Sequence, residues 1–177
     1  EHDKLFRNAY HGGRVQGFRL GHVKDSYLSY LDFTSLYPTT MRDPLLYGQP
    51  TEVSPAPFEK GEEGIAKVRF YIKPGTKAHR LPVIMSDVPG RGLVPQQPDI
   101  DHQLEEYVTS VELKHAIANG YVVTKYLKKY VFKCEPWLRP LIDKLYRMKI
   151  SAEENKDAVG RQIAKLLLNS LYGFWAL

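Results

Sequence analysis

The stretch Lys165-Leu-Leu-Leu-Asn-Ser-Leu-Tyr-Gly173 constrains the fold most, because its residues separate into two faces on a helix. At ~100° per residue, one narrow stripe collects two cations, an amide and a phenol. Its members are Arg161, Lys165, Asn169 and Tyr172. The remaining arc is apolar and contains Ile163, Leu166, Leu167, Leu168 and Leu171. We therefore predict a helix over 158–172 that packs a leucine face and presents a polar stripe.

Two explanations of this stripe remain open at this point. Arg161 and Lys165 lie one turn apart, and like charges at this spacing repel each other on an isolated helix. An anionic ligand such as a triphosphate would relieve that repulsion. The alternative is an ordinary amphipathic helix whose basic face is solvated.

A second informative segment is Asp32-Phe-Thr-Ser-Leu-Tyr-Pro38, which follows a strand-like run, Tyr27–Leu31. A carboxylate at a strand end suits metal-assisted phosphoryl transfer, because Mg²⁺ takes one or two carboxylates together with substrate phosphates and waters. Asp32 and the carbonyl of Phe33 are the candidate ligands for a pair of such ions. The alternative is that Asp32 or Ser35 caps a short helix over 36–41.

The glycine pair in Tyr10-His-Gly-Gly13 permits positive φ or a close backbone approach. Tyr10, directly before it, has a ring that can stack on a nucleic-acid base. A plain turn that leads into a strand is the alternative.

The middle of the chain indicates a small α+β insertion. Residues 42–60 are rich in Pro and Gly and suggest loops, and strands are expected at 65–72, 81–85 and 121–132. Thr109-Ser-Val-Glu112 resembles a capping box at the start of a helix that ends at Gly120. From Trp137 to Glu154 the pattern is again helical. This second helix and the one over 158–172 should form a hairpin whose surface carries Lys149, Arg161 and Lys165.

The fold class expected is α+β, with a partial sheet, an inserted small α+β subdomain and a helical hairpin. The boundaries expected are 1–46, 47–135 and 136–177. The single cysteine excludes an internal disulfide, no run approaches a membrane span, and the six histidines show no metal-ligand spacing. The net charge of +5 is modest, but the basic residues concentrate in 121–165, which is compatible with a polyanionic partner. The absence of an initiator methionine and the apolar ending Phe-Trp-Ala-Leu177 suggest a fragment of a longer protein.

The motifs Asp32-Phe-Thr-Ser-Leu-Tyr-Pro38 and Lys165-Leu-Leu-Leu-Asn-Ser-Leu-Tyr-Gly173 resemble the palm and fingers motifs of family B DNA polymerases. Tyr10-His-Gly-Gly13 is similar to the linker motif between the exonuclease and polymerase regions of that family. An insertion of this length between the two motifs resembles the protein-primed branch found in small linear-genome phages and linear plasmids. The resemblance spans nearly the whole chain, and its motifs occur in the family's order.

The resemblance implies a role for each matching residue. Asp32 would be one of two catalytic metal-binding aspartates, with the Phe33 carbonyl on the nucleotide-bound metal. Tyr37 would lie under the incoming sugar and exclude a 2′-hydroxyl. The other residues implied in dNTP binding are Ser35, Leu36, Lys149, Arg161, Lys165, Asn169 and Tyr172. Those implied in DNA binding are Tyr10, Gly12, Gly13, Ser170 and Gly173.

The implied cofactors are two Mg²⁺ or Mn²⁺ ions, with dNTP as substrate. The implied partners are template-primer DNA, a terminal protein primer and the remainder of the polymerase, with no membrane. The family's Tyr-x-Asp-Thr-Asp motif, which carries the second catalytic aspartate, does not occur in the sequence, and the exonuclease motifs and thumb are missing too. We therefore expect residues 1–177 alone not to polymerise. The alternative is a non-catalytic DNA-binding or terminal-protein-binding module from a split or decayed gene.

Overall fold

A computed structural model describes residues 2–11, 17, 19–24, 27–88 and 90–176. The chain divides into two compact units. The first unit comprises Glu1–Gly17 and Leu46–Lys133, and the second comprises Phe18–Leu45 and Cys134–Leu177. The chain combines helices with antiparallel strands, so the predicted α+β class is confirmed.

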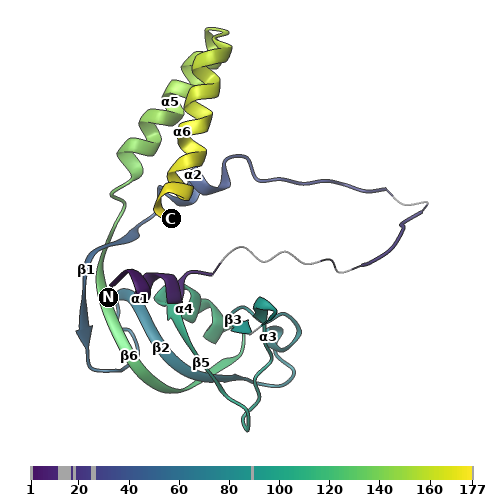
Figure 1. Cartoon of the computed structure of the whole chain (residues 1–177), viewed down its shortest axis with the longest axis vertical. Helices are drawn as coiled ribbons and strands as arrows, with labels where there is room; N and C mark the ends of the chain where they lie inside the picture. Colours follow the sequence, from purple (N-terminus) through teal and green to yellow (C-terminus); the bar gives the residue numbers. More distant parts are fainter. Residues whose placement is uncertain (1, 12–16, 18, 25–26, 89, 177) are drawn as a thin grey trace. The chain divides into compact units, whose positions relative to one another are not determined.

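A curled four-stranded sheet forms the centre of the first unit (Figure 1). Its strand order is β1 (Leu45–Val53), β6 (Tyr121–Glu135), β2 (Glu63–Ile72) and β5 (Leu104–Thr109). β2 pairs antiparallel with both β6 and β5. Because side chains alternate along a strand, Ala66, Val68, Phe70 and Ile72 share one face, and all are buried in the main core.

Helix α4 (Ser110–Ala118) contributes Leu113 and Ala116 to this core. Its N-terminus is capped by Thr109, whose Oγ1 accepts a hydrogen bond from the backbone N–H of Glu112 at 3.2 Å. The predicted capping interaction is therefore confirmed. Gly120 follows the helix with φ 114°, and a Cβ there would lie 2.3 Å from the hydroxyl of Thr76. This position requires glycine for both reasons.

A smaller apolar cluster holds α1 (His2–Ala9), a helix that the sequence analysis did not predict. Leu5 and Ala9 lie one turn apart and are buried against Ile65 and Phe132. The ring of Phe6 lies 5.1 Å from that of Phe132, centroid to centroid. Packing against the sheet therefore stabilises a helix that is too short to persist alone.

Two predictions for the first unit were wrong. The strand expected at 81–85 begins only at Met85, where β3 (Met85–Val88) pairs with β4 (Gly92–Pro95). The N–H groups of Val83 and Ile84 instead donate to the hydroxyl of Tyr121, at 2.9 and 3.1 Å. The region 42–60, expected to be loop, contains β1. Its Gly48 and Pro50 are tolerated because β1 is an edge strand. The unit also contains a short helix, α3 (Lys77–Arg80).

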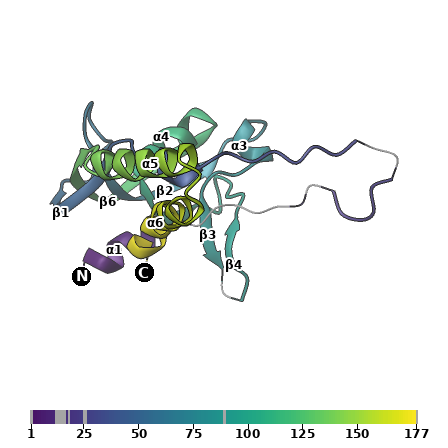
Figure 2. The same cartoon turned by 90° about the horizontal axis from the view of Figure 1, so that it is seen from above.

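The second unit contains α2 (Leu36–Thr40) and the hairpin of α5 (Arg139–Glu154) and α6 (Ala158–Ala176). The hairpin helices run side by side (Figure 1), and Figure 2 shows the pair from above. They turn where Lys156 adopts φ 56° and Asp157 Oδ1 accepts the N–H of Gly160 at 2.9 Å. The core of the unit contains Met41, Leu138, Ile142, Leu145 and Leu168. α6 does not end at Gly173 but continues to Ala176.

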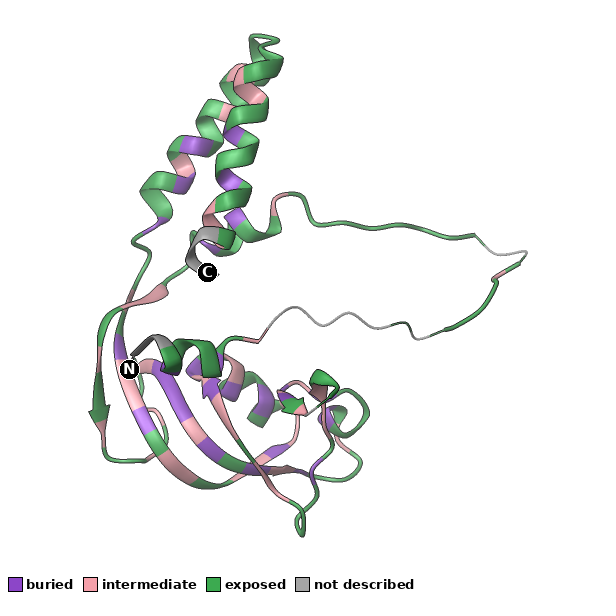
Figure 3. Cartoon of the chain, viewed as in Figure 1, coloured by how far each residue is buried: buried purple, intermediate pink, exposed green. Residues whose placement is uncertain are grey.

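The predicted leucine face of α6 is only partly buried (Figure 3). Leu168 is 2% exposed, whereas Ile163, Leu166 and Leu167 are between 43% and 64% exposed. The neighbouring helices α5 and α2 cover only part of the apolar arc. No helix in the described part of the chain is long and apolar enough to cross a membrane.

The strand predicted at 27–31 is absent, because these residues have no regular secondary structure and pair with no other strand of the described chain. Tyr27, Leu28, Tyr30 and Leu31 are each at least 79% exposed. Their composition favours a strand, but without a neighbouring strand the backbone groups gain no ladder hydrogen bonds.

Candidate functional site

The segment from Asp32 to Pro38 enters α2 through a constrained turn. Ser35 occupies the N-cap with φ 55°, an uncommon backbone conformation for a residue other than glycine. Its side chain makes no capping hydrogen bond, so the helix-cap role considered for Ser35 is not observed. Asp32 lies three positions before the N-cap, and its side chain is exposed. The segment therefore presents an acidic side chain just before a short helix.

Tyr37 on α2 and Tyr172 on α6 bring the two sequence motifs together. Their rings are parallel, and the centroids lie 4.5 Å apart. Tyr172 also packs against the buried cluster of Met41, Leu138, Ile142, Leu145 and Leu168. Leu36, at the start of α2, remains 48% exposed. The stack places the segment that follows Asp32 against the C-terminal part of α6.

The polar stripe of α6 is directed to the surface. Lys165 and Asn169 are exposed, and Arg161 forms an ion pair with Glu153, with 3.4 Å between Nε and Oε1. Both side chains of that pair are more than 40% exposed, so it contributes little to stability and leaves Arg161 accessible to an anion. The stripe combines two cations, an amide and a phenol on one helix.

Three other predicted residues of this unit are placed differently. Lys149 on α5 is partly buried, and its ammonium lies 5.5 Å from the ring centroid of Tyr146. The hydroxyl of Ser170 donates to the carbonyl of Leu167 at 3.1 Å, within its own helix. Gly173 lies inside α6, and a Cβ at this position would have nothing within 4 Å.

The predicted linker motif lies in the first unit. Tyr10 follows α1, and its side chain is 47% exposed. Gly12 and Gly13 lie outside the described residues.

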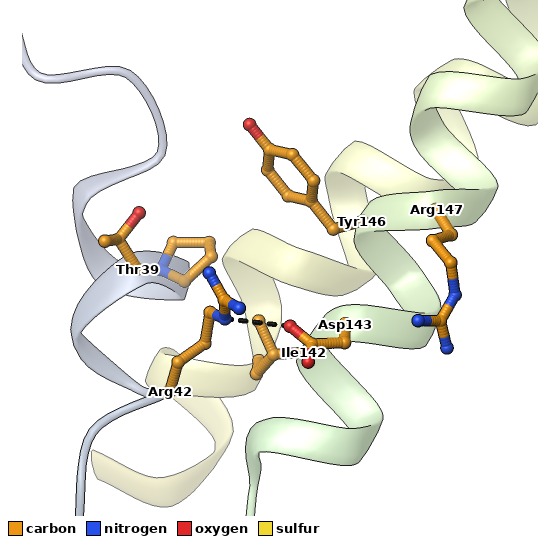
Figure 4. A pocket seen from close by; sticks show the side chains of 7 residues that line it. Thr39, Arg42, Ile142, Asp143, Tyr146 and Arg147 are labelled. Atoms are coloured by element: carbon orange, nitrogen blue, oxygen red, sulfur yellow. Dashed lines mark ion pairs between the residues drawn. The ribbon is translucent and has the colours of Figure 1, made fainter.

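A hollow of about 370 Å³ lies between α2 and α5 (Figure 4). Arg42 Nε and Asp143 Oδ1 form an ion pair across it at 2.8 Å. The backbone carbonyl of Arg42 also accepts a hydrogen bond from Arg139 Nε at 2.9 Å. The residues that line the hollow are Pro38, Thr39, Arg42, Ile142, Asp143, Tyr146 and Arg147. None of them was a predicted site residue. The spacing of Asp143 and Arg147 by one helical turn was the one signal in the sequence.

Within the described residues, no group of three or more His, Cys, Asp or Glu side chains is placed to hold a metal ion. The exposed carboxylate of Asp32 and the adjacent carbonyl of Phe33 are nevertheless hard oxygen donors. Mg²⁺ accepts such donors when substrate phosphates and waters complete its coordination. These residues fit a shared substrate–metal site better than a closed protein site.

The family model described as DNA polymerase type B, organellar and viral, matches residues 1–177. Among solved structures, the orthorhombic form of Phi29 DNA polymerase matches with a TM-score of 0.69 and 24% identity. That match covers 99% of this chain and 31% of the polymerase. Phi29 DNA polymerase complexed with primer-template DNA matches over 80% of this chain and 24% of that one, with TM-score 0.61 and 24% identity. Its ternary complex with incoming nucleotide gives TM-score 0.58 and 24% identity over 80% of this chain and 25% of that one.

At this level of identity the structural matches establish a shared fold. The chain spans less than a third of the length of these polymerases. No significant match is found among curated protein sequences.

Proposed function

Because this chain belongs to the organellar and viral type B DNA polymerases, we propose that it carries the nucleotide-binding part of a DNA-directed DNA polymerase site. The observation that carries the proposal is the contact between Tyr37 and Tyr172. It joins the segment that bears Asp32 to the helix that bears the cationic stripe. A substrate that is both metal-bound and polyanionic needs these two elements close together.

In this proposal Asp32 and the Phe33 carbonyl hold divalent metal, either Mg²⁺ or Mn²⁺. When bound, a pair of such ions stabilises the attacking and leaving oxygens of nucleotidyl transfer. Arg161 and Lys165 bind phosphate oxygens through charge-assisted hydrogen bonds, and Lys149 adds positive charge nearby on α5. Lys165 is exposed and the side chain of Arg161 is 43% exposed, so the N–H groups of both remain available to an anionic ligand.

The nucleoside part of the substrate is assigned to the residues around the stack. Tyr37 lies under the sugar, where a planar ring sterically excludes a 2′-hydroxyl. Asn169 and Tyr172 line the base-pair pocket, and Ser35 and Leu36 supply backbone near the triphosphate. The left-handed conformation of Ser35 supports this assignment, because strained backbone is concentrated at functional sites.

The partner of the site is primer-template DNA, as in the Phi29 polymerase complexes that share the fold. Tyr10, Gly12, Gly13, Ser170 and Gly173 are assigned to DNA contacts. A terminal protein primer and the remainder of the polymerase are the other proposed partners. Residues 1–177 contribute one metal-binding aspartate in this account, so we expect them to bind nucleotide without polymerising it.

The proposal is tested by measuring dNTP binding to the protein in the presence of Mg²⁺ by calorimetry. Lys165→Ala should raise Kd by about 10- to 100-fold, the size expected for one charge-assisted hydrogen bond. Lys144→Ala is the matched control, because Lys144 is an exposed lysine on α5 outside the stripe. Binding that is absent, or equally weakened by both changes, would favour a DNA-binding or terminal-protein-binding module without nucleotide chemistry.

A further inference from the structure

His11 is partly buried although it directly precedes the glycine pair of the linker motif. Its side chain is 10% exposed, whereas the adjacent Tyr10 is 47% exposed. His11 Nδ1 lies 3.2 Å from Oε1 of Glu112, whose side chain is 20% exposed. The sequence analysis assigned no role to any histidine. The two partners are 101 positions apart, so local sequence patterns do not reveal the pair.

Both partners of this pair are held on fixed elements of the first unit. Glu112 lies in the first turn of α4, and its own backbone N–H is bound by Thr109. Helix α1, which precedes His11, is anchored to the sheet through Leu5 and Ala9. Directly after the helix, the backbone N–H of Tyr10 donates a hydrogen bond to the carbonyl of Arg7 at 3.3 Å. The packing of α1 therefore places His11 close to Glu112 independently of the ion pair between them.

The surroundings of His11 favour its protonated form. The hydrogen bond with Glu112 raises the pKa of His11 above its ordinary value of 6.5, although burial acts in the opposite direction. The carboxylates of Glu112 and Glu106 both add attraction to the imidazolium. Burial raises the pKa of Glu106. The positive charge of Lys67 lowers this pKa, and the negative charge of Asp87 raises it.

We propose that His11 is a positioning residue, whose ion pair with Glu112 fixes the backbone directly after α1 and so orients the adjacent Tyr10 for contact with a DNA template strand. The inference rests on the proposed function of this segment. Its physical reason is that two consecutive glycines allow many backbone directions. An anchor at His11, directly before them, keeps that freedom from reaching Tyr10, which is then held between α1 and the ion pair.

The proposal gives a definite pH dependence. Because the pKa of His11 is raised in the folded protein, the anchoring interaction is fully present below pH 6.5. It is lost as the pH rises through the higher folded value. DNA affinity should therefore fall as the pH is raised from 6 to 8.5. The deprotonation of His11 should cause this fall.

The experiment measures the Kd for a fluorescent primer-template DNA by anisotropy at pH 6.0 to 8.5, with the full-length protein. At pH 6, His11→Gln should weaken binding about fivefold, at the lower end of usual coupling between sites, and should remove the His11-dependent part of the pH profile. Glu112→Gln should have a similar effect, and the double variant should be no worse than either single one. His11→Lys keeps a permanent cation and should preserve binding at high pH.

His102→Gln is the matched control. His102 Nδ1 lies 3.1 Å from Asp99 Oδ1 in the same unit, but these side chains are 87% and 62% exposed. This change should leave both the affinity and the pH profile intact. Thermal unfolding of each variant separates a loss of contact from a loss of fold.

Two failures are distinguishable. A wild-type protein that binds no primer-template DNA overturns the proposed function, together with the positioning role that rests on it. Binding whose pH profile is identical in the wild type and His11→Gln overturns only the role of His11. A binding loss in His11→Gln that follows reduced unfolding temperature, and is not seen in Glu112→Gln, also overturns that role.

Discussion

The rings of Tyr37 and Tyr172 are parallel, with centroids 4.5 Å apart, and they join two sequence motifs that are far apart in the chain. We expect this contact to be worth about 0.5–1.5 kcal/mol beyond simple burial. A double-mutant cycle on Tyr37→Ala and Tyr172→Ala, followed by denaturant unfolding, measures it directly. Tyr146→Ala paired with Tyr172→Ala is the control, and its coupling should be close to zero. Strict additivity of the Tyr37 and Tyr172 changes would show that the stack is energetically silent.

Tyr37 is also proposed to select deoxyribonucleotides over ribonucleotides. Tyr37→Val removes the planar ring, so the full-length protein should incorporate ribonucleotides more readily relative to deoxyribonucleotides. The measurement is the ratio of kcat/KM for dNTP and rNTP. Tyr146→Val should leave that ratio unchanged. A Tyr37→Val enzyme with wild-type discrimination would remove Tyr37 as the steric gate.

The hairpin core depends on one face of α5. Ile142 is fully buried in the cluster with Met41, Leu138, Leu145 and Leu168, whereas the adjacent Leu141 is 42% exposed. Ile142→Ala should lower the free energy of unfolding by about 2–5 kcal/mol, because it removes methyl groups and leaves a cavity. Leu141→Ala should cost much less. Similar losses for the two variants, measured by urea unfolding, would contradict the packing of this hairpin.

Acid should weaken the first unit through Glu62. The hydrogen bond that the buried Lys129 donates holds the pKa of Glu62 below its ordinary value of 4.5, and the backbone N–H of Glu59 acts in the same direction. The stabilising contribution of Glu62 is therefore present above pH 4.5 and is lost as the pH falls through the lower folded value. Glu62→Gln should flatten the unfolding free energy between pH 3 and 5.

Glu59→Gln is the control for this prediction, because Glu59 contributes its backbone N–H to Glu62, at 2.8 Å. Its acid profile should follow the wild type. If the free energy of unfolding of Glu62→Gln varied with pH as in the wild type, the interaction with Lys129 would not contribute to stability.

Local sequence patterns predicted the elements whose determinants are close together in the chain. The cap of α4 needs only Thr109 and Glu112, and the hairpin needs only helical periodicity with a polar turn near Lys156. α1 was missed although Leu5 and Ala9 have the spacing of one helical turn, because so short a helix depends on distant Ile65 and Phe132. The Pro/Gly content of β1 was misleading because its position at the sheet edge is a tertiary property.

Burial on α6 was harder to predict than the helix itself. A helical projection shows which side chains are apolar but does not show how wide an arc the neighbouring elements cover. Leu168 is buried, whereas Leu166 is 64% exposed. The candidate site was likewise only partly predictable from local sequence. The motifs of Asp32 and Lys165 were visible in the sequence, whereas the His11–Glu112 pair and the hollow beside Arg42 needed the fold.

The most direct test of the account is primer extension by the full-length protein carrying Asp32→Asn. The change keeps the shape of the side chain and removes the charge proposed to bind metal. We predict a fall in synthesis of at least about 100-fold, as expected for loss of one preorganised electrostatic contact, with DNA affinity largely retained. Asp43→Asn, at another exposed aspartate of the same unit, should extend primers normally. Wild-type synthesis by Asp32→Asn, or equal loss of synthesis and DNA binding, would contradict the account.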